Sequence, residues 1–174
     1  NLLSYPLPSP SFSRMSPSKR FAFAPISADT RPLFILRPDE LAAFLSGPGK
    51  PWAGWLKAAG FEAGLGEVRL LPAPDGKGVA GAVAGLGNDA ARRRLRFGLA
   101  KAVPSLPEGD WRLEGNLSPV EAFEATLGWL LSGYRFDRYR PGRKLAPQPR
   151  LVCPAGLDPA RLLAMAEAEA LTRD

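Results

Sequence analysis

From Leu33 onward, short apolar runs alternate with longer stretches in which apolar residues recur every three or four positions. A short apolar run between turn residues is typical of a buried strand, and the wider spacing is typical of one face of a helix. The predicted order is strand, helix, helix, strand, strand, helix, strand, helix, strand and helix. This alternation predicts an α/β fold with a mixed, mostly parallel sheet and helices on both of its faces.

The predicted strands are short, and two of them are close enough in the sequence to form a hairpin. The turn-forming segment 74–78, Pro-Asp-Gly-Lys-Gly, separates the second strand from the third. We therefore expect one antiparallel pair within the sheet. The strands are predicted over residues 33–36, 67–71, 79–86, 110–114 and 150–153.

The predicted helices begin at recognisable capping residues. The clearest start is Ser118-Pro119-Val120-Glu121, where Ser118 caps the helix, Glu121 completes a capping box and Pro119 suits the first helical position. The other helices are expected to begin at Pro38, Pro51, Asn88 and Asp158, and the one from Asn88 to continue to Val103. In the helix after Ser118, one face is lined by Val120, Phe123, Leu127, Leu130 and Leu131.

The first 32 residues differ in composition from the rest of the chain. Their apolar stretches are interrupted by Pro6, Pro8, Pro10, Pro17, Pro25 and Pro32. Proline removes a backbone donor and interrupts helices and inner strands. We predict a disordered Pro/Ser-rich tail over residues 1–32, with disorder through at least Lys19, followed by one α/β domain over residues 33–174. Met15 is a possible start of translation, so the segment before it is left out of the fold argument.

The composition excludes several kinds of active site. The chain contains no histidine and one cysteine, Cys153, so no Ser-His or Cys-His nucleophile can be built and no histidine can hold a metal. Cys153 follows two apolar residues and is expected to be a buried strand residue. The acidic residues are dispersed and form no recognisable set of metal ligands. We therefore predict no catalytic, cofactor-binding or metal-binding residue in this chain.

The sequence also indicates the setting of the protein. A single cysteine rules out a disulfide within the chain. No apolar run approaches the roughly 20 residues that a membrane-spanning helix needs, and no signal-peptide core is present near residue 1. We expect a cytoplasmic protein without a membrane partner.

The chain carries 23 Lys and Arg residues against 17 Asp and Glu residues, a net charge of +6. Two segments concentrate the positive charge: the helical run Arg92–Arg96 and the loop Tyr134–Lys144, which interleaves aromatic and basic residues. Either is suited to nucleic acid, although a basic helical run is more often a solvated face and such a loop also suits docking on a neighbouring domain. Gly85-Leu86-Gly87 lacks the third glycine of a phosphate-binding fingerprint, because Ala90 takes its place, and favours a tight turn.

The segment Gly128–Tyr139, GWLLSGYRFDRY, resembles the Y-x-F-D-x-Y segment of bacterial leucyl aminopeptidases, the cytosol aminopeptidase family. The preceding helix with Glu121-Ala122 fits the same place in that family. The end of the chain, Ala166–Asp174, resembles the helix that leads into the family's R-D-L-x-N-x-P-x-N linker, of which the first two residues are present here. The resemblance covers residues 33–174 and is weaker before Gly85.

The resemblance implies an N-terminal α/β domain that is similar to macro domains, packs on a catalytic domain and helps to organise a hexamer. It also implies that the catalytic domain holds two divalent metal ions, zinc or manganese, through lysine and carboxylate ligands that all lie beyond Asp174. The implied function is therefore that of a non-catalytic N-terminal domain of a leucyl-aminopeptidase-like metallopeptidase, which releases N-terminal amino acids from peptides. The present chain is expected to be inactive alone and to serve assembly and substrate access.

Two other functions stay open at this point. A stand-alone macro-like module would bind nucleic acid or ADP-ribose, and the basic loop would serve either ligand. An independent enzyme is the least supported, because the chain carries no catalytic motif. The Pro/Ser-rich tail departs from the family pattern, and the sequence is compatible with a fragment, a truncated gene product or a stand-alone domain.

Overall fold

The computed structural model describes residues 21–94, 98–133 and 147–173 and places five strands in one sheet. The strand order is β2-β3-β1-β4-β5, with β2 antiparallel to β3 and every other neighbouring pair parallel. The predicted mixed, mostly parallel sheet with one hairpin is therefore confirmed. The strands span Arg31–Leu36 (β1), Val68–Pro72 (β2), Val79–Gly85 (β3), Gly109–Glu114 (β4) and Pro149–Leu151 (β5).

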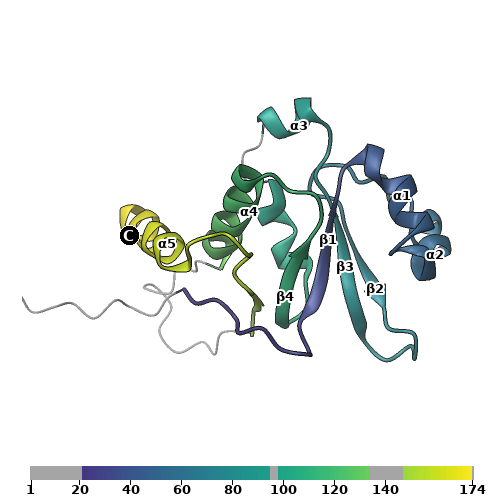
Figure 1. Ribbon diagram of the computed structural model, residues 1–174, viewed down its shortest axis with the longest axis horizontal. Coiled ribbons are helices and arrows are strands. Elements are labelled where there is room, and N and C mark those ends of the chain that lie inside the picture. Colours follow the sequence, from purple (N-terminus) through teal and green to yellow (C-terminus); the bar gives the residue numbers. More distant parts are fainter. Residues whose placement is uncertain (1–20, 95–97, 134–146, 174) are drawn as a thin grey trace, which may run out of the picture.

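Helices cover both faces of the sheet, as predicted (Figure 1). The short helices α1 and α2 cover one face, α4 covers the other, and α5 lies outside α4 as a further layer. Helix α3 lies at the end of the sheet where the parallel strands terminate (Figure 1). The α-helices span Leu41–Ser46 (α1), Ala53–Ala58 (α2), Asp89–Arg94 (α3), Pro119–Ser132 (α4) and Pro159–Arg173 (α5). Short 3-10 helices span Pro38–Glu40 (η1), Lys50–Trp52 (η2), Gly98–Lys101 (η3) and Val103–Ser105 (η4).

Within the described part of the chain, three apolar clusters hold the layers together. The first packs α4, η3 and η4 on the sheet and contains the buried Trp111 and Trp129. The second packs α1 and α2 on the opposite face and contains Leu56, which is 1% exposed. The third joins α4 to α5 through Leu130 and Leu162. Because burying a leucine contributes about 1.5–3 kcal/mol, α4 gains stability from both of its sides.

The capping residues act as predicted. The Ser118 Oγ accepts a hydrogen bond from the Glu121 N–H at 3.2 Å, and the Glu121 carboxylate accepts one from the Ser118 N–H at 2.8 Å. The Asn88 Oδ1 accepts a hydrogen bond from the Ala91 N–H at 2.9 Å, and the Asp158 Oδ1 accepts two from the first turn of α5. These bonds satisfy N–H groups that a helix start leaves without an intrahelical partner.

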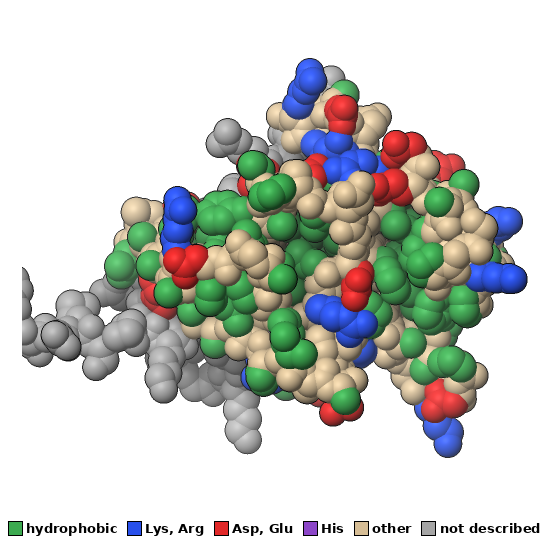
Figure 2. Space-filling model, in the orientation of Figure 1, with side chains coloured by type: hydrophobic (Ala, Val, Ile, Leu, Met, Phe, Trp, Pro, Cys, Tyr) green, Lys and Arg blue, Asp and Glu red, His purple; other side chains and the backbone are tan. Residues whose placement is uncertain are grey.

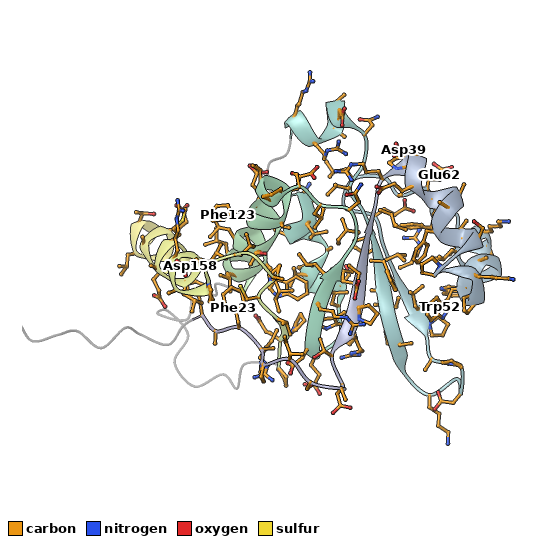
Figure 3. All side chains as sticks on the ribbon, viewed as in Figure 1. Phe23, Asp39, Trp52, Glu62, Phe123 and Asp158 are labelled. Carbon is orange, nitrogen blue, oxygen red and sulfur yellow. The ribbon has the colours of Figure 1, made fainter. Side chains whose placement is uncertain are left out.

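Residues 21–32, which we assigned to the predicted tail, have defined positions in the structure, and β1 begins at Arg31. The Ala24 N–H donates to the Leu151 carbonyl at 2.8 Å, and Ala24 forms a parallel bridge with Val152. Phe21 and Phe23 pack against the third cluster, and Phe23 lies near α5 (Figure 3). The proline content of this segment did not predict its order. A single bridge at Ala24 needs few backbone donors, and Phe21 and Phe23 have apolar partners in the third cluster. Residues 1–20 lie outside the described part of the chain.

Three further expectations need correction. The helix predicted from Asn88 to Val103 is divided into α3 and the 3-10 turns η3 and η4, and residues 95–97 lie outside the described part. Val120 is 66% exposed, because it lies in the first turn of α4, ahead of the part that reaches the core. Cys153 is only partly buried and follows β5 instead of lying within it.

Candidate functional site

The carboxyl ends of the parallel strands meet at one edge of the sheet, where three segments distant in sequence converge. Arg37 follows β1, Gly87 comes shortly after β3, and Asn116 comes shortly after β4. In open α/β sheets this edge is the usual place of ligand binding. A shallow hollow of about 430 Å³ lies there and is lined by Arg37, Pro38, Asp39, Gly87, Asn88, Asp89, Ala90 and Arg92.

Arg37 is the central residue of this edge. Its Nη2 donates to both carboxylate oxygens of Glu121, at 2.7 and 2.8 Å. Its Nη1 donates to the Asn116 carbonyl at 2.7 Å and reaches the Glu40 carboxylate at 3.4 Å. The guanidinium therefore ties the end of β1 to the end of β4 and to the start of α4.

Arg92 contributes a second guanidinium from α3. It donates to the Gly87 carbonyl at 2.7 Å, forms an ion pair with Asp89 and lies 3.8 Å from the Glu121 carboxylate. Glu121 thus lies between two arginines that come from different elements. Figure 2 shows basic and acidic side chains in contact at the end of the molecule where α3 lies. We call Arg37, Glu40, Arg92 and Glu121, with Asp89, the edge cluster.

The electrostatics of the edge cluster favour the charged forms of Arg37 and Glu121. Burial alone raises the pKa of Glu121, but hydrogen bonds from Ser118 and Arg37 outweigh this effect and bring the pKa below its usual value. Burial alone lowers the pKa of Arg37, and the contacts with Glu121 and Glu40 reverse this effect and raise the pKa. The two directions agree, since each residue stabilises the charge on the other.

The arrangement limits what the edge can do chemically. A phosphate or carboxylate ligand needs donors that are free to turn toward it. The Arg37 guanidinium and much of the Arg92 guanidinium are already directed at the protein's own carboxylates and carbonyls. A cation would need acidic groups that are not opposed by arginine, and the described residues contain no group of three Cys, Asp or Glu side chains placed to hold a metal. The contacts of the edge cluster instead connect the end of β1, the end of β4, α3 and the start of α4 to one another.

The Gly85-Leu86-Gly87 segment is a packed turn. Its three N–H groups donate to the carbonyls of Glu67, Leu36 and Ala63 at 2.8, 2.8 and 3.1 Å, so none points into the hollow. A Cβ atom on Gly85 would lie 2.0 Å from the Gly64 carbonyl oxygen. The glycine is therefore required by close backbone packing, which supports the tight-turn interpretation over a phosphate cradle.

The basic segments are largely outside this site. Arg92 belongs to the edge cluster instead of a solvated face, whereas Arg93 is exposed. Arg96 and the loop residues 134–146 lie outside the described part of the chain. Nine of the 23 Lys and Arg residues, but only two of the 17 Asp and Glu residues, fall in the segments that the structure does not describe. Positive charge is therefore not concentrated on the described domain.

The sequence predicted a structural role for Glu121, one of the two residues in the Arg37–Glu121 ion pair of the edge cluster. It gave Glu121 a capping role, which the structure confirms, and it missed that Arg37 binds the same carboxylate. A signal for Arg37 was available, because a charged residue directly after a buried strand lies at the carboxyl edge of a parallel sheet. The partner on α4 was not available, since it lies 84 residues further along the chain.

Burial, followed by the negative charge of Asp158, raises the pKa of the Cys153 thiol, which makes this thiol a poor nucleophile. Within the described residues, none of the helices combines the length and the apolar composition needed to cross a lipid bilayer.

Comparison with known proteins gives a family. Residues 31–154 match the family model described as M17 aminopeptidase, N-terminal domain. Among solved structures, the cytosol aminopeptidase of Coxiella burnetii aligns with a TM-score of 0.66 at 21% identity, over 86% of this chain and 31% of that chain. The bottromycin maturation enzyme BotP aligns with a TM-score of 0.56 at 25% identity, over 85% of this chain and 32% of that chain. No curated protein sequence matches the chain.

A plant enzyme extends the same comparison. A tomato leucine aminopeptidase mutant aligns with a TM-score of 0.51 at 15% identity, over 82% of this chain and 34% of that chain. The fold is thus that of a domain found in aminopeptidases, and this chain spans about a third of the length of those proteins. The chain belongs to the M17 aminopeptidase N-terminal domain family, because the family model covers well over half of it.

Proposed function

We propose that this chain acts as the non-catalytic N-terminal domain of a leucyl-aminopeptidase-like metallopeptidase and serves assembly and substrate access. The observation that carries the proposal is the family match over residues 31–154, in a chain that spans about a third of its structural relatives. The edge cluster supports it, because the place where α/β domains usually bind ligands is occupied here by internal ion pairs.

The partners follow from the same proposal. A catalytic domain that continues beyond Asp174 would carry two divalent metal ions, zinc or manganese, and would hydrolyse N-terminal residues from peptides in the cytoplasm. A structure of BotP was solved in complex with Mn, which fits this expectation for the parent activity. The domain described here would pack on the catalytic domain and help to form a homo-oligomer, with six subunits in the parent family.

The first experiment assays the purified chain on a chromogenic leucine substrate, with and without added manganese or zinc. We expect no turnover above a blank without protein, because no histidine and no described metal-ligand group is present. A Cys153→Ala variant run beside it should behave identically. Activity that survives purification and is abolished by a chelator would contradict the proposal. If the coding sequence continues beyond Asp174, the longer protein should hydrolyse the same substrate.

A stand-alone macro-like module that binds ADP-ribose or nucleic acid is the second candidate. The hollow at the carboxyl edge of the sheet and the basic residues outside the described part favour it. Calorimetry with ADP-ribose and an electrophoretic shift with DNA separate the candidates. Saturable binding of ADP-ribose by the folded chain would replace the first proposal, whereas the absence of heat with ADP-ribose and of a shift with DNA would support the first proposal.

A further inference from the structure

Among the residues that the structure describes, strand β2 is an edge of the sheet, since it pairs with β3 on one side and with no strand on the other. Glu67 accepts a hydrogen bond from the Gly85 N–H across this pair, and Arg69 lies opposite Val83. Because backbone groups alternate in direction along a strand, the carbonyls of Val68 and Leu70 point away from β3. The register shifts between Leu71 and Pro72, and the Pro72 carbonyl is also reached from outside the β2-β3 pair, by the Trp52 indole. A row of unpaired backbone N–H and C=O groups along an edge strand is a template to which a strand of another chain can add.

Each of these three outward carbonyls accepts a hydrogen bond from a side chain of the same domain. The Arg69 Nη1 donates to the Val68 carbonyl at 2.9 Å, and the Trp55 Nε1 donates to the Leu70 carbonyl at 3.1 Å. The Trp52 Nε1 donates to the Pro72 carbonyl at 2.9 Å. Three consecutive outward acceptors are thus occupied.

The donors are held in place by the layer that covers this face of the sheet. Trp52 ends η2 and lies beside β2 (Figure 3), and Trp55 belongs to α2, the helix that follows directly. The Arg69 Nη2 also donates to the Ala59 carbonyl at the end of α2, at 3.2 Å. Trp55 is 51% exposed, so its position is not explained by burial in the core. The hydrogen bond from its Nε1 to the Leu70 carbonyl explains why Trp55 lies against the edge of β2.

The opposite edge of the sheet is closed by different means. Ala24 bridges to Val152 directly after β5, and its N–H donates to the Leu151 carbonyl. That edge is covered by backbone from the start of the described chain. The edge at β2 has no such backbone partner among the described residues and relies on side-chain donors.

We propose that Trp52, Trp55 and Arg69 form an edge guard that prevents strand addition to β2. A second copy of the chain that paired with β2 would have to displace three donors, and Pro72 offers no N–H in return. Association with another copy through the β2 edge is therefore disfavoured. This inference does not depend on the proposed function, since it concerns the described domain alone.

The test is the double variant W52F/W55F in the full chain, which retains two aromatic rings and removes both indole donors. Sedimentation velocity should show self-association about tenfold tighter than in the parent chain, because the indole donors to the Leu70 and Pro72 carbonyls are both removed. In the associated state, the outward N–H groups of Val68 and Leu70 should exchange more slowly with solvent. The single variant W55F, which alters a half-exposed position, should show the same change to a smaller degree.

Ser118→Ala is the matched control, because it weakens the fold by removing the N-cap of α4 at a position away from β2. It should associate no more than the parent chain. The proposal is overturned if folded W52F/W55F and W55F remain as monomeric as the parent. It is equally overturned if S118A associates to the same extent, or if association leaves exchange at Val68 and Leu70 unchanged.

Discussion

The two faces of the sheet are both covered by apolar clusters, but their helices are anchored in different ways. On one face, α1 and α2 have six residues each and belong to the chain segment that leads directly into β2. On the other face, α4 has 14 residues, is packed between the sheet and α5, and is tied by Glu121 to Arg37, 84 residues earlier. Helices α1 and α2 are therefore anchored near segments that follow closely in the sequence, whereas α4 is anchored by contacts with segments that are distant in the sequence.

This difference has a consequence for stability. Helices of six residues are far too short to be stable alone in water, so α1 and α2 exist through their packing on the sheet. Helix α4 is near the length at which isolated helices become marginal, and two apolar clusters and the edge cluster act on it together. Damage to α4 should therefore spread to two layers, whereas damage near α2 should remain on one face.

The largest expected effect comes from truncating a core residue on each face. Trp129→Ala should cost about 3–5 kcal/mol and Leu56→Ala about 2–5 kcal/mol, because both leave cavities in packed clusters. Chemical denaturation gives the two values. Native-state hydrogen exchange should show that Trp129→Ala lowers protection in both α4 and α5, while Leu56→Ala lowers it in α1 and α2. Equal loss of protection on both faces in each variant would remove the distinction.

An intermediate effect is expected from the edge cluster. Glu121→Gln should lower the free energy of unfolding by about 1.5–3 kcal/mol at neutral pH, the usual worth of hydrogen bonds to charged groups. The folded pKa of Glu121 is below its unfolded value, so its stabilising effect is present above the unfolded pKa and is lost as the pH falls through the folded pKa. The difference between the parent chain and Glu121→Gln should therefore shrink on acidification below about pH 4, the reference range for glutamate. A difference that stays constant between pH 7 and pH 3 would show that the carboxylate charge is not what holds α4.

The smallest effect is expected at the helix cap itself. Ser118→Ala removes the acceptor of the Glu121 N–H and should cost about 1 kcal/mol, with a lower midpoint of denaturation. The Glu121 contacts with Arg37 do not involve the Ser118 hydroxyl, so the pH dependence described above should persist in this variant. An unchanged midpoint would mean that the edge cluster alone fixes the start of α4.

The local elements were largely predictable from the sequence. The turn at residues 74–78, the capping box at Ser118 and the cap at Asp158 rest on contacts within about four residues, and all three are present in the structure. The sheet type followed from the alternation of strands and helices. The family resemblance, which rested on the segments 128–139 and 166–174, agrees with the family match over residues 31–154.

The errors occurred where distant segments decide the outcome. The segment 21–30 was assigned to a tail by its proline and serine content, yet Ala24 pairs beside β5 and Phe23 packs against the third cluster. The helix predicted from Asn88 to Val103 is divided, although its local pattern was continuous. Near that division a Cβ atom on Gly98 would lie 2.5 Å from the Leu65 side chain, a contact that depends on the loop before β2.

The sequence by itself determined the kinds of elements, their order and the family, because periodicity, caps and turns act over a few residues. Only the tertiary structure decided that Arg37 binds Glu121, that Trp52 and Trp55 occupy the outer carbonyls of β2, and that Ala24 lies beside β5. Each of these contacts depends on the order and register of the strands. That order brings apolar residues from distant segments together in the clusters on the two faces of the sheet, which no single stretch of the chain encodes.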